Sequence, residues 1–246
     1  QGVPENAKTI VVIPAIYSTP EEVKELGERL ELHYLANRDT HIHFAVLGDL
    51  HDAEKAEMPS DHNVKQSASA EIKRLKDSYP EASFHWLQRE RRWNEVERIW
   101  MGWERKRGKL VEFVELLQGH SGTSFQWVGG TEESLKGIKY VFTLDADTEL
   151  PLESAKRMIG TLHLPYNRPR LNEQGTRVVE GYGVLQPRMG ITHEAAHRSR
   201  FAQLWSAEPG VDPYAFAMSD PYQDGLGQAI FTGKGIFDVQ AFHQVL

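Results

Sequence analysis

The amino-acid sequence predicts an α/β fold in which helices cover both faces of a mostly parallel central sheet. Short runs of branched apolar residues alternate with helical segments, as in parallel strands joined by crossover helices. Several of these runs lack polar alternation, which is typical of strands buried on both faces. Acidic residues end or follow two of the runs. Because ligands bind at the carboxyl ends of strands in such sheets, we expect the functional site there.

Five segments are predicted as strands: residues 9–16, 43–50, 84–87, 140–144 and 178–186. The predicted helices are one from Pro20 to about Asn37, one near residues 64–78, one long helix over 93–117 with a break near Gly108, and one after Pro151. The first has a clear start, because Ser18 and Thr19 can cap it and Pro20 precedes two glutamates. No repeat or linker divides the chain, so we predict one domain over residues 1–246.

Composition excludes several classes of protein. The 246 residues carry a net charge of −7, which argues against general binding to nucleic acid or to anionic membranes. The absence of cysteine excludes disulfides, thiol catalysis and zinc held by cysteine. No apolar run is long enough to span a bilayer, and the chain begins at Gln1 without a visible signal peptide. We interpret it as a soluble piece of a longer protein.

Asp145-Ala146-Asp147 follows an apolar strand and precedes a helix that starts near a proline. Two carboxylates in this position suit a divalent cation, Mg²⁺ or Mn²⁺, that holds a diphosphate and neutralises a departing nucleoside diphosphate. A polar turn with a capping aspartate is the structural alternative. A phosphatase of the haloacid-dehalogenase type is disfavoured, because Glu149 stands where its motif needs Thr or Val and the motif lies far from the start of the chain.

A second motif, His193-Glu194-Ala195-Ala196-His197, has the spacing of a zinc metalloprotease helix. No third ligand follows at the usual distance, so we favour a coincidence on a surface helix. Residues 89–109 are rich in Arg and Lys, with tryptophans interleaved. This stretch is either a solvated basic face backed by tryptophans in the core, or a clamp for a diphosphate that includes Arg107.

Several segments, taken in chain order, resemble the glycosyltransferase domain of cyclic β-1,2-glucan synthases. They are residues 100–110 (WMGWERKRGKL), 143–148 (TLDADT), 181–183 (GYG), 185–188 (LQPR) and 231–235 (FTGKG). The resemblance runs from about residue 14 to residue 242. It implies a GT-A-like fold and an inverting, metal-dependent transfer of glucose from UDP-glucose to a β-glucan acceptor.

The resemblance also implies site residues. Asp145 and Asp147 would bind the metal and the diphosphate, and Asp49 would contact the uridine. Lys109 would contact the diphosphate from the rim of the cleft. Arg107 and Lys234, in basic segments that match the family, would also bind the nucleotide sugar. Full-length members of this family carry transmembrane helices and a phosphorylase-like module. The chain is therefore expected to be a cytoplasmic-side domain of a bacterial inner-membrane protein.

The resemblance implies that the catalytic base lies beyond Leu246, so we expect this chain to bind donor nucleotide without polymerising glucose. Within the chain, Asp220 and Asp224 are the candidates for the base that takes the proton of the acceptor hydroxyl. The rival hypothesis is a non-catalytic module that binds glucan through an open aromatic platform and has no metal-dependent affinity for nucleotides.

Overall fold

The computed structural model describes residues 2–187 and 233–245. By its internal contacts the chain divides into two compact units, residues 1–185 with 235–246 and residues 186–234. The fold described below is that of the first unit. A single domain over residues 1–246 stays a prediction.

The first unit is built on a seven-stranded sheet in the order β10-β11-β7-β1-β2-β3-β6. Its strands are β1 (Thr9–Tyr17), β2 (Ile42–Leu50), β3 (Phe84–Arg89), β6 (Phe125–Gly129), β7 (Tyr140–Thr143), β10 (Val184–Leu185) and β11 (Gly235–Asp238). The four central strands, β7, β1, β2 and β3, run parallel to one another. β6 and β11 join them in antiparallel pairs at either side.

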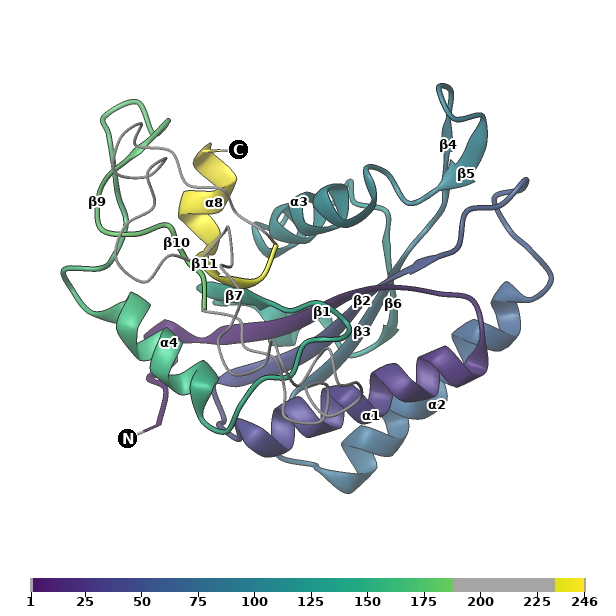
Figure 1. Cartoon of the computed structure of the whole chain (residues 1–246), viewed down its shortest axis with the longest axis horizontal. Helices are drawn as coiled ribbons and strands as arrows, with labels where there is room; N and C mark the ends of the chain where they lie inside the picture. Colours follow the sequence, from purple (N-terminus) through teal and green to yellow (C-terminus); the bar gives the residue numbers. More distant parts are fainter. Residues whose placement is uncertain (1, 188–232, 246) are drawn as a thin grey trace, which may run out of the picture. The chain divides into compact units, whose positions relative to one another are not determined.

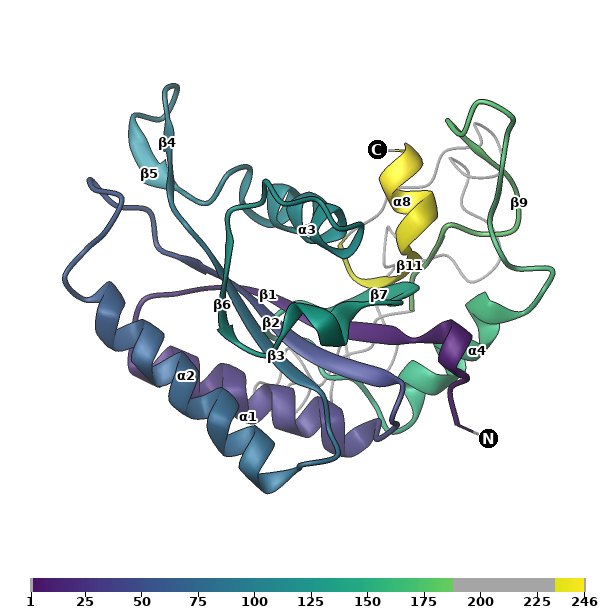
Figure 2. The ribbon, with the colours of Figure 1, turned by 180° about the vertical axis from the view of Figure 1, so that it is seen from behind.

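Helices cover both faces of this sheet (Figures 1 and 2). They are α1 (Pro20–Ala36), α2 (Asp61–Ser78), α3 (Arg105–Leu117), α4 (Ser154–His163) and α8 (Val239–Val245), with short 3₁₀ helices η1 (Glu5–Ala7) and η2 (Glu132–Leu135). α1, α2 and α4 share one hydrophobic core with the sheet, and α3 and α8 lie on the other face. The predicted fold class, α/β and GT-A-like with a mostly parallel sheet, is confirmed.

α1 begins where the sequence predicts. Thr19 is the N-cap and accepts a hydrogen bond from the backbone N–H of Glu22, whose carboxylate accepts one from the Thr19 N–H in return. This reciprocal capping satisfies amides that have no partner inside the helix. Pro20 fits the first turn because it lacks the donor that would be left unpaired there.

The prediction of one long helix over residues 93–117 is wrong. Its first part is a hairpin of β4 (Arg92–Asn94) and β5 (Ile99–Met101), and only α3 is helical. Trp93 and Trp100 are seven residues apart, which suggests two helical turns, but they face each other across the hairpin with ring centroids 5.9 Å apart. The Asn94 side chain accepts two backbone N–H groups of the turn, an alternative to helical pairing.

The predicted strand over residues 178–186 is also divided. β9 (Val178–Glu180) pairs with β8 (Arg170–Leu171) in a small separate sheet, whereas β10 joins the central sheet. Gly181 lies between them with φ = 72°, a conformation that glycine adopts without strain. β6 was not expected from the sequence, and its antiparallel pairing gives β3 a neighbour on the outer side.

Three histidines lie buried in the first unit. His43 and His85 stack on adjacent strands with ring centroids 5.6 Å apart, and His33 lies on α1. Burial lowers the pKa of His33 and of His43 to about 4 and that of His85 to about 3. The folded protein therefore holds all three rings neutral at mildly acidic pH.

This burial predicts a fall in stability on acidification. Below about pH 6.5, the unfolded chain takes up protons that the folded protein does not bind. The free energy of unfolding should fall by about 1.4 kcal/mol per pH unit for each buried histidine, until the pH approaches the folded pKa values. Urea denaturation from about pH 7 to pH 5, above the range in which most carboxylates titrate, measures this slope. His85→Gln should reduce the slope and the exposed His62→Gln should not; an unchanged slope in His85→Gln contradicts the assignment.

Candidate functional site at the carboxyl edge of the sheet

Asp49, the predicted nucleotide-binding acid near the end of β2, belongs to a buried ion cluster. Arg89, at the end of β3, donates from Nε to Asp49 Oδ1 and from Nη2 to Asp49 Oδ2, both at 2.8 Å. Arg89 also donates to Glu112 Oε2 on α3, at 3.2 Å. The Arg89 side chain is 0% exposed and that of Asp49 4%. Such paired, bidentate geometry compensates charges that burial would otherwise penalise.

The same guanidinium fixes the start of α3. Arg89 donates to the carbonyl oxygens of Trp103 and Arg105, at 2.8 and 2.9 Å. Glu104 and Arg105 both have positive φ, 45° and 49°, which is unusual for residues other than glycine. Gly102 permits the close approach, because a Cβ at this position would lie 2.6 Å from Asp49 Oδ2. Arg89 thus couples the ends of β2 and β3 to the first turn of α3.

Lys109 lies beneath the surface of the site, and the expectation that it lies at the rim is wrong. Its Nζ donates to the Ala15 carbonyl oxygen at 2.7 Å and lies 3.1 Å from Asp49 Oδ2. The side chain is 1% exposed. Burial lowers the pKa of Lys109 to about 8, and the Asp49 carboxylate opposes this shift. Direct contact of Lys109 with a diphosphate, and of Asp49 with a uridine, stay predictions.

Lys106, on α3, reaches Asp145, the first acid of the Asp145-Ala146-Asp147 motif. Its Nζ pairs with Oδ1 of Asp145, two residues beyond the end of β7, and both side chains are about one-third exposed. Lys106 and Lys109 are three residues apart and therefore lie on one face of α3. This helix face thus pairs with Asp49, near the end of β2, and with Asp145, after β7, and these two strands lie on either side of β1.

Asp147, the second acid of the Asp145-Ala146-Asp147 motif, is exposed. The turn that carries it is closed by a hydrogen bond from the Thr148 N–H to the Asp145 carbonyl oxygen at 3.0 Å. Among residues 2–187 and 233–245, no three His, Cys, Asp or Glu side chains gather to form a metal site. Asp145 and Asp147 can therefore supply carboxylate oxygens to a hard cation, with the remaining ligands to come from phosphate and water.

The basic stretch over residues 89–109 does not form one cationic surface. Arg89 and Lys109 are buried in the ion cluster, and Arg91 is buried against Asp61. Arg107 points into solvent with a side chain that is 80% exposed. The tryptophans do not all back this stretch from the core, since Trp93 and Trp103 are 43% and 44% exposed.

Sequence reasoning included Arg89 and Lys106 only as members of the basic stretch over residues 89–109, and it missed Glu112. It predicted none of the ion pairs that these three residues form at this edge. The three-residue interval between Lys106 and Lys109 was visible and would have placed both on the same face. Nothing local marks Arg89 or Glu112, because their partners are distant in the sequence.

Other predicted residues fall elsewhere. Asp220 and Asp224, the candidate bases, lie outside the described residues, as does the His193-Glu194-Ala195-Ala196-His197 motif. Lys234 is described but belongs to the second unit. Their functional roles stay predictions.

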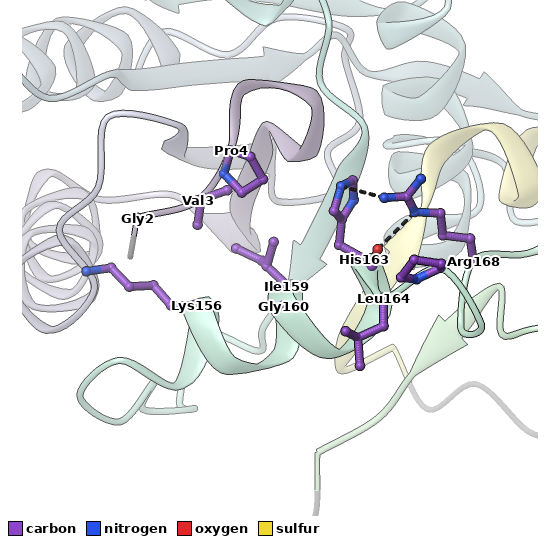
Figure 3. Close-up of a pocket in the computed structure, with 10 residues that line it drawn as sticks. Gly2, Val3, Pro4, Lys156, Ile159, Gly160, His163, Leu164 and Arg168 are labelled. Atoms are coloured by element: carbon purple, nitrogen blue, oxygen red, sulfur yellow. Dashed lines mark hydrogen bonds between the residues drawn. The ribbon is translucent and has the colours of Figure 1, made fainter.

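A hollow of about 310 Å³ lies at the opposite edge of the sheet (Figure 3). It is lined by residues 2–4, which precede β1, by Ile159 of α4, and by residues at and just beyond the carboxyl end of α4. Lys156 stands on one side of it, and His163 and Arg168 stand on the other. His163 contacts Tyr140, the first residue of β7, which places the hollow at the amino ends of the strands. It contains none of the predicted site residues.

Comparison with known proteins identifies a relative of this chain. The chain is 42% identical over 250 aligned residues to the cyclic β-(1,2)-glucan synthase NdvB of Rhizobium meliloti. The chain is therefore related to one segment of a cyclic glucan synthase. The alignment covers 100% of this chain but only 9% of that protein. The resemblance expected from the motifs is confirmed, and no protein-family model matches the chain. Among the described residues, no helix has the length and apolar character needed to cross a membrane.

The ion cluster predicts a large stability difference between two arginines that both contact Glu112. Arg89→Met leaves Asp49 and Glu112 buried without the guanidinium, and should lower the free energy of unfolding by about 3–5 kcal/mol. Arg92 is 51% exposed and lies 3.7 Å from Glu112 Oε1, so Arg92→Met should cost less than about 1 kcal/mol. Urea denaturation compares the two variants; equal losses would refute the central role of Arg89.

Proposed function

We propose that this chain is a nucleotide-sugar-binding glycosyltransferase domain that transfers glucose from UDP-glucose, with inversion, in the synthesis of β-1,2-glucan. The identity of 42% with a cyclic β-(1,2)-glucan synthase supports the transferase class. The observation that supports the choice of site is that Asp49 and Asp145 pair with two lysines, Lys109 and Lys106, on the same face of α3. A position on the cytoplasmic side of a membrane-embedded parent protein is part of the same proposal.

The residues present fit a divalent cation that is shared with a diphosphate. Mg²⁺ is commonly held by one or two carboxylates together with substrate phosphates and water, and Asp145 and Asp147 offer those carboxylates. Asp147 is exposed and Asp145 partly so, which leaves both accessible to a ligand from solvent. When bound, the cation supplies charge neutralisation to the departing nucleoside diphosphate.

The chain's own residues would position the donor. Arg89, Asp49 and Lys109 hold the start of α3 against the strand ends, so the donor would meet a preformed surface. A preformed surface lowers the entropic cost of orienting a bound substrate. Lys106 and the exposed Arg107 are cations of α3 that solvent reaches, and both can contact phosphate oxygens. Arg105, half exposed, is paired with Asp52 instead. Asp220 and Asp224 remain the candidates for the base within the chain.

The exposed tryptophans favour a second candidate function, a module that binds glucan without catalysis. Trp93 on the β4–β5 hairpin and Trp103 before α3 each expose more than two-fifths of their surface. Flat aromatic faces of this kind can bind apolar faces of other molecules, including sugar rings. Such a module would bind β-glucan oligosaccharides equally well with and without a chelator. It would show no metal-dependent affinity for UDP.

Calorimetry with UDP separates the two functions. We expect UDP to bind in the presence of Mn²⁺ or Mg²⁺ and to lose its affinity when EDTA is added. Asp145→Ala should weaken UDP binding by at least about tenfold, the loss expected for one charged contact. Glu149→Ala is the matched control, because Glu149 is an exposed acid close to the same turn and lies outside the proposed site.

Two outcomes would contradict the proposed metal-dependent donor site. One is UDP binding of equal strength with Mn²⁺ and with EDTA. The other is an Asp145→Ala variant that binds UDP as the unmodified chain does. Tight, stoichiometric zinc that is lost in His193→Ala would instead support the protease interpretation of the second motif.

A further inference from the structure

The carboxylate proposed to hold a metal already holds an ammonium group. Lys106 Nζ pairs with Oδ1 of Asp145, and both side chains are about one-third exposed. A divalent cation on the same carboxylate would bring two positive centres within a few ångströms of each other. At an effective dielectric constant typical of a protein surface, such repulsion is substantial. The Lys106–Asp145 pair and a metal on Asp145 therefore oppose each other.

The two lysines on this face of α3 differ in their freedom to move. Lys109 is 1% exposed, and its Nζ is fixed between the Ala15 carbonyl and Asp49. The Lys106 side chain is 36% exposed, and its ammonium group is carried by a flexible four-carbon chain. Lys106 can therefore leave Asp145 without breaking the buried cluster, whereas Lys109 cannot move without breaking it.

We propose that Lys106 is an exchangeable counter-ion of the donor site. Without nucleotide it neutralises Asp145; when a divalent metal and a nucleoside diphosphate bind, it releases Asp145 to the metal and turns its ammonium to the phosphate oxygens. The proposal rests on the proposed function and assigns to Lys106 a role in binding and positioning the diphosphate. The exchange couples the two binding events, because metal alone must displace the ammonium whereas the diphosphate offers it a new partner.

The exchange predicts opposite effects of one substitution on two binding reactions. Lys106→Met removes the charge but keeps most of the stem. Its affinity for Mn²⁺ alone should rise, by up to about fivefold, because the competing ammonium is gone. Its affinity for UDP in saturating Mn²⁺ should fall by about tenfold, because a charged phosphate contact is lost. Electron paramagnetic resonance of free Mn²⁺ measures the first reaction, and calorimetry with UDP measures the second.

Lys156→Met is the matched control. Lys156 is also a partly exposed, ion-paired lysine, 27% exposed and 3.9 Å from Glu153, and it lies at the amino edge of the sheet. It should leave both affinities unchanged. Lys106→Arg should restore UDP binding in part, because it keeps a cation in reach of phosphate. The thermal unfolding midpoint of each variant shows whether α3 is still folded.

Each remaining outcome contradicts a definite claim. If Lys106→Met changes both affinities in the same direction, or neither, the exchange is wrong and Lys106 has a structural role or none. If UDP binds in EDTA and this binding is lost in Lys106→Met, the lysine replaces the metal, and the exchange is again wrong. If the unmodified chain shows no metal-dependent binding of UDP, the proposed function itself fails.

Discussion

The buried ion pair between Arg89 and Asp49 is the interaction on which the geometry of the carboxyl edge depends. Every N–H of the Arg89 guanidinium has an acceptor, from Asp49, Glu112, or the carbonyls of Trp103 and Arg105. Because desolvation offsets much of the attraction in a buried pair, its main value is positional. It joins two strand ends to a helix whose N-cap, Glu104, and first residue, Arg105, have strained backbone angles.

This arrangement divides the edge into a rigid part and an adjustable part. Arg89, Asp49, Glu112 and Lys109 are all less than a tenth exposed and carry balanced charges. Rearranging them would leave an uncompensated charge in the interior. Lys106 and Asp145 are accessible to solvent and exchange partners at lower cost. A site built this way keeps its shape while one ion pair responds to what binds.

Local patterns predicted the elements that local forces determine. The apolar runs of β1, β2 and β7 and the capping of α1 are properties of neighbouring residues, and the structure confirms them. The prediction of one long helix over residues 93–117 is wrong because the spacing of Trp93 and Trp100 fits both a helix and a hairpin. The choice between them depends on contacts across the fold, such as the bridge from Trp100 to Ala53.

The acids of the site were predictable for the same reason: Asp49 and Asp145 lie at strand ends, where parallel sheets bind ligands. Their partners were not. The burial of Lys109 depends on Ala15, which is 94 residues away in the chain, and Arg89 is separated from Asp49 by 40 residues. Charge alone suggested an exposed clamp, whereas packing placed three of these cations, Arg89, Arg91 and Lys109, in the interior.

We place the binding of a metal-nucleotide complex at the carboxyl edge, between α3 and the Asp145 turn. Paramagnetic broadening of backbone amide signals by Mn²⁺ with UDP tests it most directly, because the effect falls steeply with distance from the ion. We expect the signals of residues 105–109 and 145–148 to broaden, and those of Gly2 and Gly160 at the opposite hollow to stay sharp. Broadening centred on the hollow, with the α3 signals unchanged, would contradict it.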